Sequence, residues 1–156
     1  MSDLDERLVE YLEKLRRENK CVVQIIGPRD SGKTLVITEL IKMLRQSYPE
    51  TRVLVIKHSH HKRIDVEEKD SFRYLEAGGD AALVFVEGEY ALFSRKIDPL
   101  EILGSLSVDI VFLEGLREYE SPMRIDLGEK RDSREVIKEL YQRILESKCL
   151  SRRGDA

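Results

Sequence analysis

Eight consecutive residues near the start of the chain have the types and the spacing that bind nucleotide phosphates. The segment 27–34 reads GPRDSGKT and matches the pattern G-x-x-x-x-G-K-[ST]. Gly27 and Gly32 allow a tight turn that directs backbone N–H groups at phosphate oxygens, and the following helix adds its positive N-terminal end. Lys33 supplies a positive charge for the β- and γ-phosphates, and Thr34 supplies a hydroxyl for a magnesium ion. The segment therefore predicts a P-loop for a magnesium-bound nucleoside triphosphate, with the candidate residues Gly27, Asp30, Ser31, Gly32, Lys33 and Thr34.

A P-loop of this kind also needs an acidic residue near the magnesium ion, and the apolar segment 109–115 offers two. Asp109 begins this predicted strand and Glu114 ends it. Ligands bind outside the carboxyl ends of the strands in such sheets, so we expect Glu114 at the site and Asp109 at the opposite edge. Glu114 would hold magnesium through water or orient the attacking water, beside Lys33 as the second catalytic candidate. The alternative is an ordinary acidic residue in a turn.

All three histidines, His58, His60 and His61, directly follow the second predicted strand. A zinc site is disfavoured, because adjacent residues rarely all point at one metal and no cysteine is near. Since the loop leaves a strand at its carboxyl end, we expect it to overhang the same crevice as the P-loop. There the histidines would contact phosphate, a second substrate or a partner protein. A solvated polar loop is the alternative.

Two further candidates follow in the segment 69–73. Asp70 either caps the helix that begins there or reaches toward the magnesium ion, and the sequence does not choose between these roles. Arg73 is a candidate phosphate contact, as are Arg29 and Arg117, although a surface arginine is more often a solvated charge.

The elements that must position these residues alternate between strands and helices. Strands are predicted at 21–26, 52–57 and 109–113, an edge strand at 123–127, and a hairpin of 81–87 and 90–95 joined at Gly88. Helices are predicted at 3–18, 33–46, 70–77, 98–106 and from 133 to about 147, the last capped by Asp132 or Ser133. This order predicts an α/β fold with a mostly parallel sheet, the three-layer sandwich of P-loop NTPases. We expect one domain: an N-terminal helix in 1–20, a core in 21–128, and a C-terminal helix and tail in 129–156. The first helix would pack on the domain or serve as a dimer contact.

Composition narrows the class of protein. The 156 residues include 27 basic and 30 acidic side chains, a formal net charge of −3, so there is no basic excess of the kind that a general nucleic-acid binder shows. The acidic N-terminus does not resemble a signal peptide, and no apolar run is long enough to cross a bilayer, so the expected location is the cytoplasm. Cys21 and Cys149 lie far apart in sequence, and reduced core thiols are favoured over a disulfide.

The ordered series of motifs resembles the MobB family of molybdopterin-guanine-dinucleotide biosynthesis proteins. After the P-loop come the segments VIKHSHH (55–61), Asp65, KDSFR (69–73), EAGG (76–79) and LEG (113–115), and the segment 122–125 resembles the last strand of the family. The resemblance covers about residues 21–128. The chain departs from the family pattern at Glu68 and Gly79, at Leu116 and Arg117, and in its N-terminal helix.

The resemblance implies a homodimeric protein that binds GTP with Mg²⁺ and hydrolyses it weakly. Its implied partner is the guanylyltransferase, MobA, which attaches GMP to molybdopterin, and its implied role is accessory to that reaction. The N-K-x-D guanine motif of classical GTPases is missing from the chain, whose nearest string is RKID at 95–98. Preference for GTP is therefore implied by the resemblance alone. Two alternatives stay open: an ATP-dependent small-molecule kinase or ligase, and an interaction protein that nucleotide switches.

Overall fold

The structure, a computed structural model, describes residues 1–59, 69–129 and 131–150. These residues group into two compact units, a division that the sequence analysis does not predict. The first unit contains the described residues of 1–59 and 107–150, and the second contains those of 69–106. The P-loop lies in the first unit.

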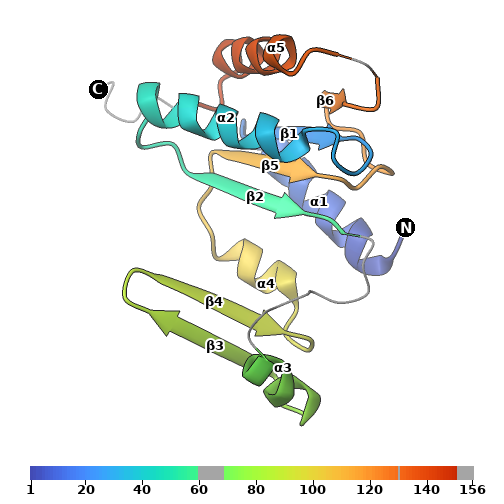
Figure 1. The fold of residues 1–156 in the computed structure, drawn as a ribbon, viewed down its shortest axis with the longest axis vertical. Helices are drawn as coiled ribbons and strands as arrows, with labels where there is room; N and C mark the ends of the chain where they lie inside the picture. The colour runs from blue at the N-terminus through green and yellow to red at the C-terminus, as the bar shows by residue number, and fades with distance from the viewer. Residues whose placement is uncertain (60–68, 130, 151–156) are drawn as a thin grey trace. The chain divides into compact units, whose positions relative to one another are not determined.

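The first unit is built on a four-stranded parallel sheet (Figure 1). Its strands lie in the order β2 (Val53–Lys57), β5 (Ile110–Glu114), β1 (Cys21–Ile26) and β6 (Met123–Asp126). All of β1 and most of β5 are buried, as expected for apolar, β-branched runs covered on both faces. The prediction that the last strand lies at an edge is confirmed. Because β5 lies between β1 and β2, the carboxyl ends of three strands meet beside the P-loop.

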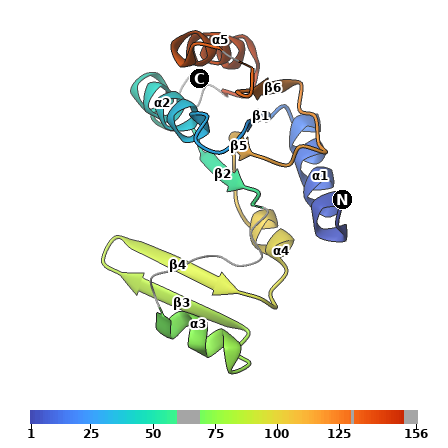
Figure 2. The same cartoon turned by 45° about the vertical axis from the view of Figure 1, so that its right-hand side comes forward.

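Helices cover both faces of this sheet, so the predicted three-layer α/β fold is confirmed. Figure 2 shows α2 (Lys33–Ser47) and α5 (Ser133–Glu146) over one face and α1 (Asp3–Arg17) over the other. The Asp132 side chain caps α5, as one of the two predictions had it. Each helix buries an apolar stripe at a spacing of three or four residues: Leu8, Leu12 and Leu15 in α1, Val36, Ile37, Leu40 and Leu44 in α2, and Val136, Leu140 and Ile144 in α5.

The second unit contains α3 (Lys69–Glu76), β3 (Ala81–Val86), β4 (Glu89–Ser94) and α4 (Pro99–Gly104). The two strands pair antiparallel, which confirms the predicted hairpin at Gly88. Asp98 caps α4 by accepting a hydrogen bond from the Leu100 amide, and Pro99 occupies the first turn, where its missing N–H costs nothing.

The prediction of reduced cysteines is wrong. Cys21 and Cys149 form a disulfide, with their Cα atoms 5.3 Å apart and a sequence separation of 128. Both are buried in the core, as predicted, but their distance in sequence conceals their contact in the fold. Cys21 is the first residue of β1, and the chain that leaves α5 returns to the same end of that strand. The Ser147 hydroxyl lies 3.0 Å from each sulfur.

Candidate functional site

The P-loop joins the carboxyl end of β1 to the first turn of α2. Gly32 has a φ of 98° as the residue preceding the helix, a conformation that side chains disfavour. A Cβ atom on Gly27 would lie 2.6 Å from the Ser31 hydroxyl and 3.1 Å from the Leu127 Cβ, so only glycine fits there. Lys33 folds back over the loop and donates hydrogen bonds of 2.8 Å to the Gly27 carbonyl and 2.9 Å to the Pro28 carbonyl. The Lys33 side chain therefore lies across the P-loop.

Polar groups of this loop fit an anion. The Ser31 hydroxyl is buried and has no hydrogen-bond partner among the described residues, an arrangement that costs free energy unless a ligand supplies one. In the same part of the chain, no side chain caps the first turn of α2, and backbone N–H groups there have no partner within a helix. A phosphate group would satisfy both, and the positive end of α2 favours its charge. The residues present therefore fit the phosphates of a nucleotide.

Glu114 ends β5 at the same edge of the sheet. It pairs with Ile25 in β1 and with Lys57 in β2. Glu114 therefore lies on the strand next to β1, level with the point where β1 leads into the P-loop. Its side chain is partly buried. Gly115, the next residue, donates its amide to the Ile25 carbonyl, and a Cβ atom on it would lie 2.8 Å from the His58 carbonyl oxygen. The predicted position of Glu114 at the carboxyl end of a buried strand is confirmed, and its role as a magnesium ligand stays a prediction.

Gln24 holds the loop that follows Glu114, a feature that the sequence analysis missed. It is fully buried in β1, and its Nε2 atom donates to the carbonyls of Gly115, Leu116 and Tyr119 at 2.8 to 3.0 Å. Its Oε1 atom accepts from the Ser121 amide at 3.0 Å. A polar residue in an otherwise apolar buried strand was the available signal, because such a group needs internal partners.

His58 contacts the N-terminal helix. Its Nε2 atom lies 2.9 Å from the Asp5 Oδ1 atom in α1, and its backbone amide donates to the Glu114 carbonyl. Burial alone would raise the pKa of Asp5, but hydrogen bonds from His58 and Ser2 outweigh it and lower that pKa. His58 thus lies beside Glu114, at the predicted edge, with a hydrogen-bonded carboxylate partner that the sequence did not indicate.

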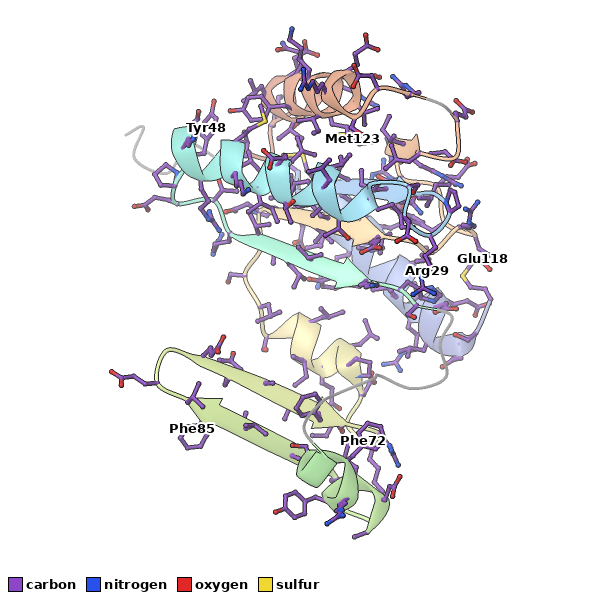
Figure 3. The ribbon with its side chains drawn as sticks, in the orientation of Figure 1. Arg29, Tyr48, Phe72, Phe85, Glu118 and Met123 are labelled. Atoms are coloured by element: carbon purple, nitrogen blue, oxygen red, sulfur yellow. A yellow bond between two sulfur atoms is a disulfide. The ribbon has the colours of Figure 1, made fainter. Side chains whose placement is uncertain are left out.

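The other candidate residues lie in three places: outside the described residues, in the second unit, and in the first unit. His60, His61 and Asp65 lie outside the described residues, and within the described ones no group of three His, Cys, Asp or Glu side chains is placed to hold a metal. Asp70 lies in the first turn of α3, which begins one residue earlier, and Arg73 is exposed on the same helix of the second unit. In the first unit Arg29 is exposed on the P-loop (Figure 3), and Arg117 is exposed in the loop after β5.

Asp109 lies at the amino ends of the strands, which confirms the prediction that it is at the edge of the sheet opposite Glu114. Its carboxylate accepts a 2.8 Å hydrogen bond from the Arg52 amide and pairs with the Arg52 guanidinium at 3.1 Å and the Lys20 ammonium at 3.6 Å. Burial alone would raise the pKa of Asp109, but these donors and charges lower it. The residue therefore joins the segments that enter β1, β2 and β5.

The comparisons with known proteins all identify the same family. The model of the MobB family, described as molybdopterin guanine dinucleotide synthesis protein B, matches residues 22–145. A putative molybdopterin-guanine dinucleotide biosynthesis adapter protein of Methanocaldococcus jannaschii is 31% identical over 101 residues, which are 62% of this chain and 41% of that protein. The corresponding adapter protein of Haemophilus influenzae is 32% identical over 105 residues, 63% of this chain and 58% of its own. The chain thus spans less than two thirds of the length of either relative.

A solved structure extends the similarity to the fold. The crystal structure of Bacillus subtilis MobB aligns with a TM-score of 0.56 and 25% identity, covering 74% of this chain and 72% of that one.

The helices described here are all too short or too polar to cross a membrane.

Proposed function

The chain belongs to the MobB family, and we propose that it is a GTP-binding accessory protein in the synthesis of molybdopterin guanine dinucleotide, with weak GTP hydrolysis. The observation that carries the proposal is the P-loop at 27–34 beside Glu114, in a chain whose residues 22–145 match this family. The two adapter proteins similar to this chain are named for the same synthesis.

The P-loop supplies the phosphate contacts. Lys33 now donates to two carbonyls of the loop, and an incoming triphosphate would offer its ammonium group stronger, charged acceptors. The Ser31 hydroxyl and the amides at the start of α2 would gain partners at the same time. Binding would therefore satisfy groups that lack partners within the described loop.

Thr34 and Glu114 are the residues that would hold a magnesium ion. Thr34 is exposed in the first turn of α2, and Glu114 ends the strand next to the one that leads into the loop. Such an ion neutralises phosphate charge and polarises the terminal phosphoryl group. With positioning and electrostatics as the chief contributions of the protein, hydrolysis should stay slow unless a partner completes the site.

The proposed assembly is a homodimer that acts with a MobA-like guanylyltransferase in the cytoplasm. One face of the β3–β4 hairpin supports a protein contact, because the cross-strand pairs Leu83–Leu92 and Phe85–Tyr90 share it and are 42% to 76% exposed. Figure 3 shows the Phe85 ring projecting away from the hairpin. A two-stranded hairpin with such a face is marginally stable alone and gains stability when it is covered.

The test is calorimetric titration of the protein with GTP and with ATP in the presence of Mg²⁺, followed by product analysis of the same samples. We expect selective GTP binding and slow formation of GDP. Lys33→Ala should abolish triphosphate binding while the circular dichroism spectrum stays unchanged, and Lys42→Ala is the matched control, since Lys42 lies in the same helix and pairs with Glu39. Unchanged GTP affinity in folded Lys33→Ala would refute the site. Selective ATP binding would refute the GTP assignment and favour a kinase or ligase.

A further inference from the structure

The helix α1 lies outside the part of the chain that matches the family model, yet it contacts the candidate site. It ends at Arg17, and the match begins at residue 22. Because α1 packs antiparallel on the sheet face opposite α2, its N-terminal end lies at the carboxyl edge of the strands (Figure 2). This is the edge where Glu114 and the P-loop lie.

The contact joins Asp5 to His58. The His58 Nε2 and Asp5 Oδ1 atoms are 2.9 Å apart, and each side chain keeps only about one fifth of its surface exposed: 19% for Asp5 and 20% for His58. A hydrogen bond that is partly shielded from water is stronger than one in water, so this pair restrains His58 at the carboxyl end of β2. The other carboxylate oxygen of Asp5 accepts from the Ser2 amide at 3.4 Å, while the Ser2 hydroxyl accepts from the Asp5 amide at 3.0 Å. Asp5 therefore belongs to the capping box of α1 and also contacts His58 through its other carboxylate oxygen.

His58 transmits this restraint to the residue that we assign to magnesium. Its amide donates a 2.9 Å hydrogen bond to the Glu114 carbonyl. Its carbonyl oxygen lies so close to Gly115 that a Cβ atom there would be 2.8 Å away. The backbone of His58 is thus packed against both residues at the end of β5, and a shift of one requires a shift of the other.

The loop that follows Glu114 also lies near α1. Tyr119 is buried in that loop, and burial together with the neighbouring Glu13 carboxylate raises the pKa of Tyr119 to about 12. Among the described residues the Tyr119 hydroxyl has no hydrogen-bond partner, and Glu13 pairs with Arg16 at 2.7 Å. The hydrogen-bonded contact that links α1 to this edge of the sheet is therefore the one between Asp5 and His58.

We propose that α1 positions the carboxyl ends of β2 and β5 for nucleotide binding, with Asp5 acting through His58 as a positioning residue for Glu114. The inference deepens the proposed function and rests on it. Asp5 itself touches neither nucleotide nor metal in this account. Its effect on affinity depends on the imidazole of His58.

The test is a double-mutant cycle on GTP affinity in the full chain, with Asp5→Ala, His58→Ala and the combination. Residues in contact couple, so we expect Asp5→Ala to weaken GTP binding by about threefold to tenfold, and to add nothing when His58 is already alanine. Ser2→Ala is the matched control, because it removes the helix cap and leaves the Asp5 carboxylate in place. The control should bind GTP as the wild type does.

Amide hydrogen exchange gives a readout that does not depend on nucleotide. In Asp5→Ala, the amides of His58 and Gly115 should exchange faster, and in Ser2→Ala they should not. If the two variants weaken GTP binding equally, or if the Asp5 and His58 effects simply add, the helix is only a structural support and the inference is overturned. If the wild type binds GTP and Asp5→Ala matches it, this inference alone fails. If the wild type binds no nucleotide, the proposed function fails and takes the inference with it.

Discussion

Of the perturbations proposed here for the first unit, breaking the Cys21–Cys149 disulfide should lower its stability the most. The bond closes a loop with a sequence separation of 128 residues. In the chain-entropy model, closing a loop of that length removes about 5 kcal/mol of entropy from the unfolded state at 25 °C. For a protein of this size, each kcal/mol shifts Tm by about 2–4 °C, so the full effect corresponds to about 10–20 °C.

The assay is thermal unfolding of three samples, followed by circular dichroism: the oxidised wild type, the wild type with excess reductant, and the Cys21→Ala/Cys149→Ala variant. Both sulfurs are buried, so the variant also loses packing and should melt no higher than the reduced wild type. Reductant should leave the variant unchanged, which separates the effect of the bond from any general effect of the reagent. Alkylation before and after reduction, read by mass spectrometry, establishes the thiol state of each sample.

The reasoning would be refuted by an oxidised wild type whose Tm differs from that of the reduced protein by less than about 2 °C, since the model gives at least several times that shift. Two free thiols in the purified, unreduced protein would refute the disulfide itself. An intermediate loss is expected where the reduced, unfolded chain keeps residual structure, because the chain-entropy value assumes that it keeps none.

Three other substitutions test the buried polar contacts of the first unit and the exposed face of the β3–β4 hairpin. Gln24→Met should lower the free energy of unfolding by about 3 kcal/mol, because it leaves buried carbonyls of the loop after β5 without a donor; urea titration measures this, and equal stability would show that the network contributes nothing. Asp109→Asn should cost about 1.5–3 kcal/mol at pH 7. Burial alone would raise the pKa of Asp109, but its hydrogen bonds and the neighbouring cations bring the pKa in the folded state below the ordinary value of 3.8. The stabilisation from Asp109 is therefore complete above pH 3.8 and is lost as the pH falls through the folded-state pKa. Urea titrations at descending pH should show the stabilities of the variant and the wild type converging. Phe85→Asp should shift the sedimentation coefficient from dimer to monomer, whereas Tyr74→Asp, at another exposed aromatic residue outside that hairpin face, should not.

Much of the first unit was predictable because its signals are local. Three local signals locate β1, the P-loop and α2: the P-loop pattern, the β-branched run before it and the apolar spacing after it. The predicted bounds of these elements agree with the structure to within a residue or two. Glu114 was predictable from a topological rule: a residue that ends a buried parallel strand must lie at the edge where such sheets bind ligands. The same rule excluded Asp109, which begins its strand.

The features that were missed all join residues far apart in sequence. Cys21 and Cys149 contact each other only because α5 returns to the start of β1, and no local pattern records that return. Disulfides persist in oxidising compartments and in intracellular proteins of hyperthermophiles, so the proposed cytoplasmic location is compatible with this bond only in the second case. The pairing of Asp5 with His58 spans 53 residues, and no local pattern around either residue indicates it.

These long-range contacts bear on how the proposed nucleotide site would be controlled. Most of the contacts that shape the P-loop are local, such as the hydrogen bonds from Lys33 to the Gly27 and Pro28 carbonyls, although Leu127 also packs against Gly27. Glu114 instead depends on neighbours from elsewhere: Gln24 holds the loop after it, and His58 packs against its backbone while paired with α1. Under the proposed function, phosphate binding would thus depend mainly on residues of the P-loop, whereas the position of the magnesium ligand would depend on residues from several segments. A partner that moves α1 or the loop after β2 would change magnesium binding first and leave phosphate binding in place. Comparing the affinity of Asp5→Ala for GTP with and without Mg²⁺ tests this directly, because a loss that is the same in both conditions would contradict the division.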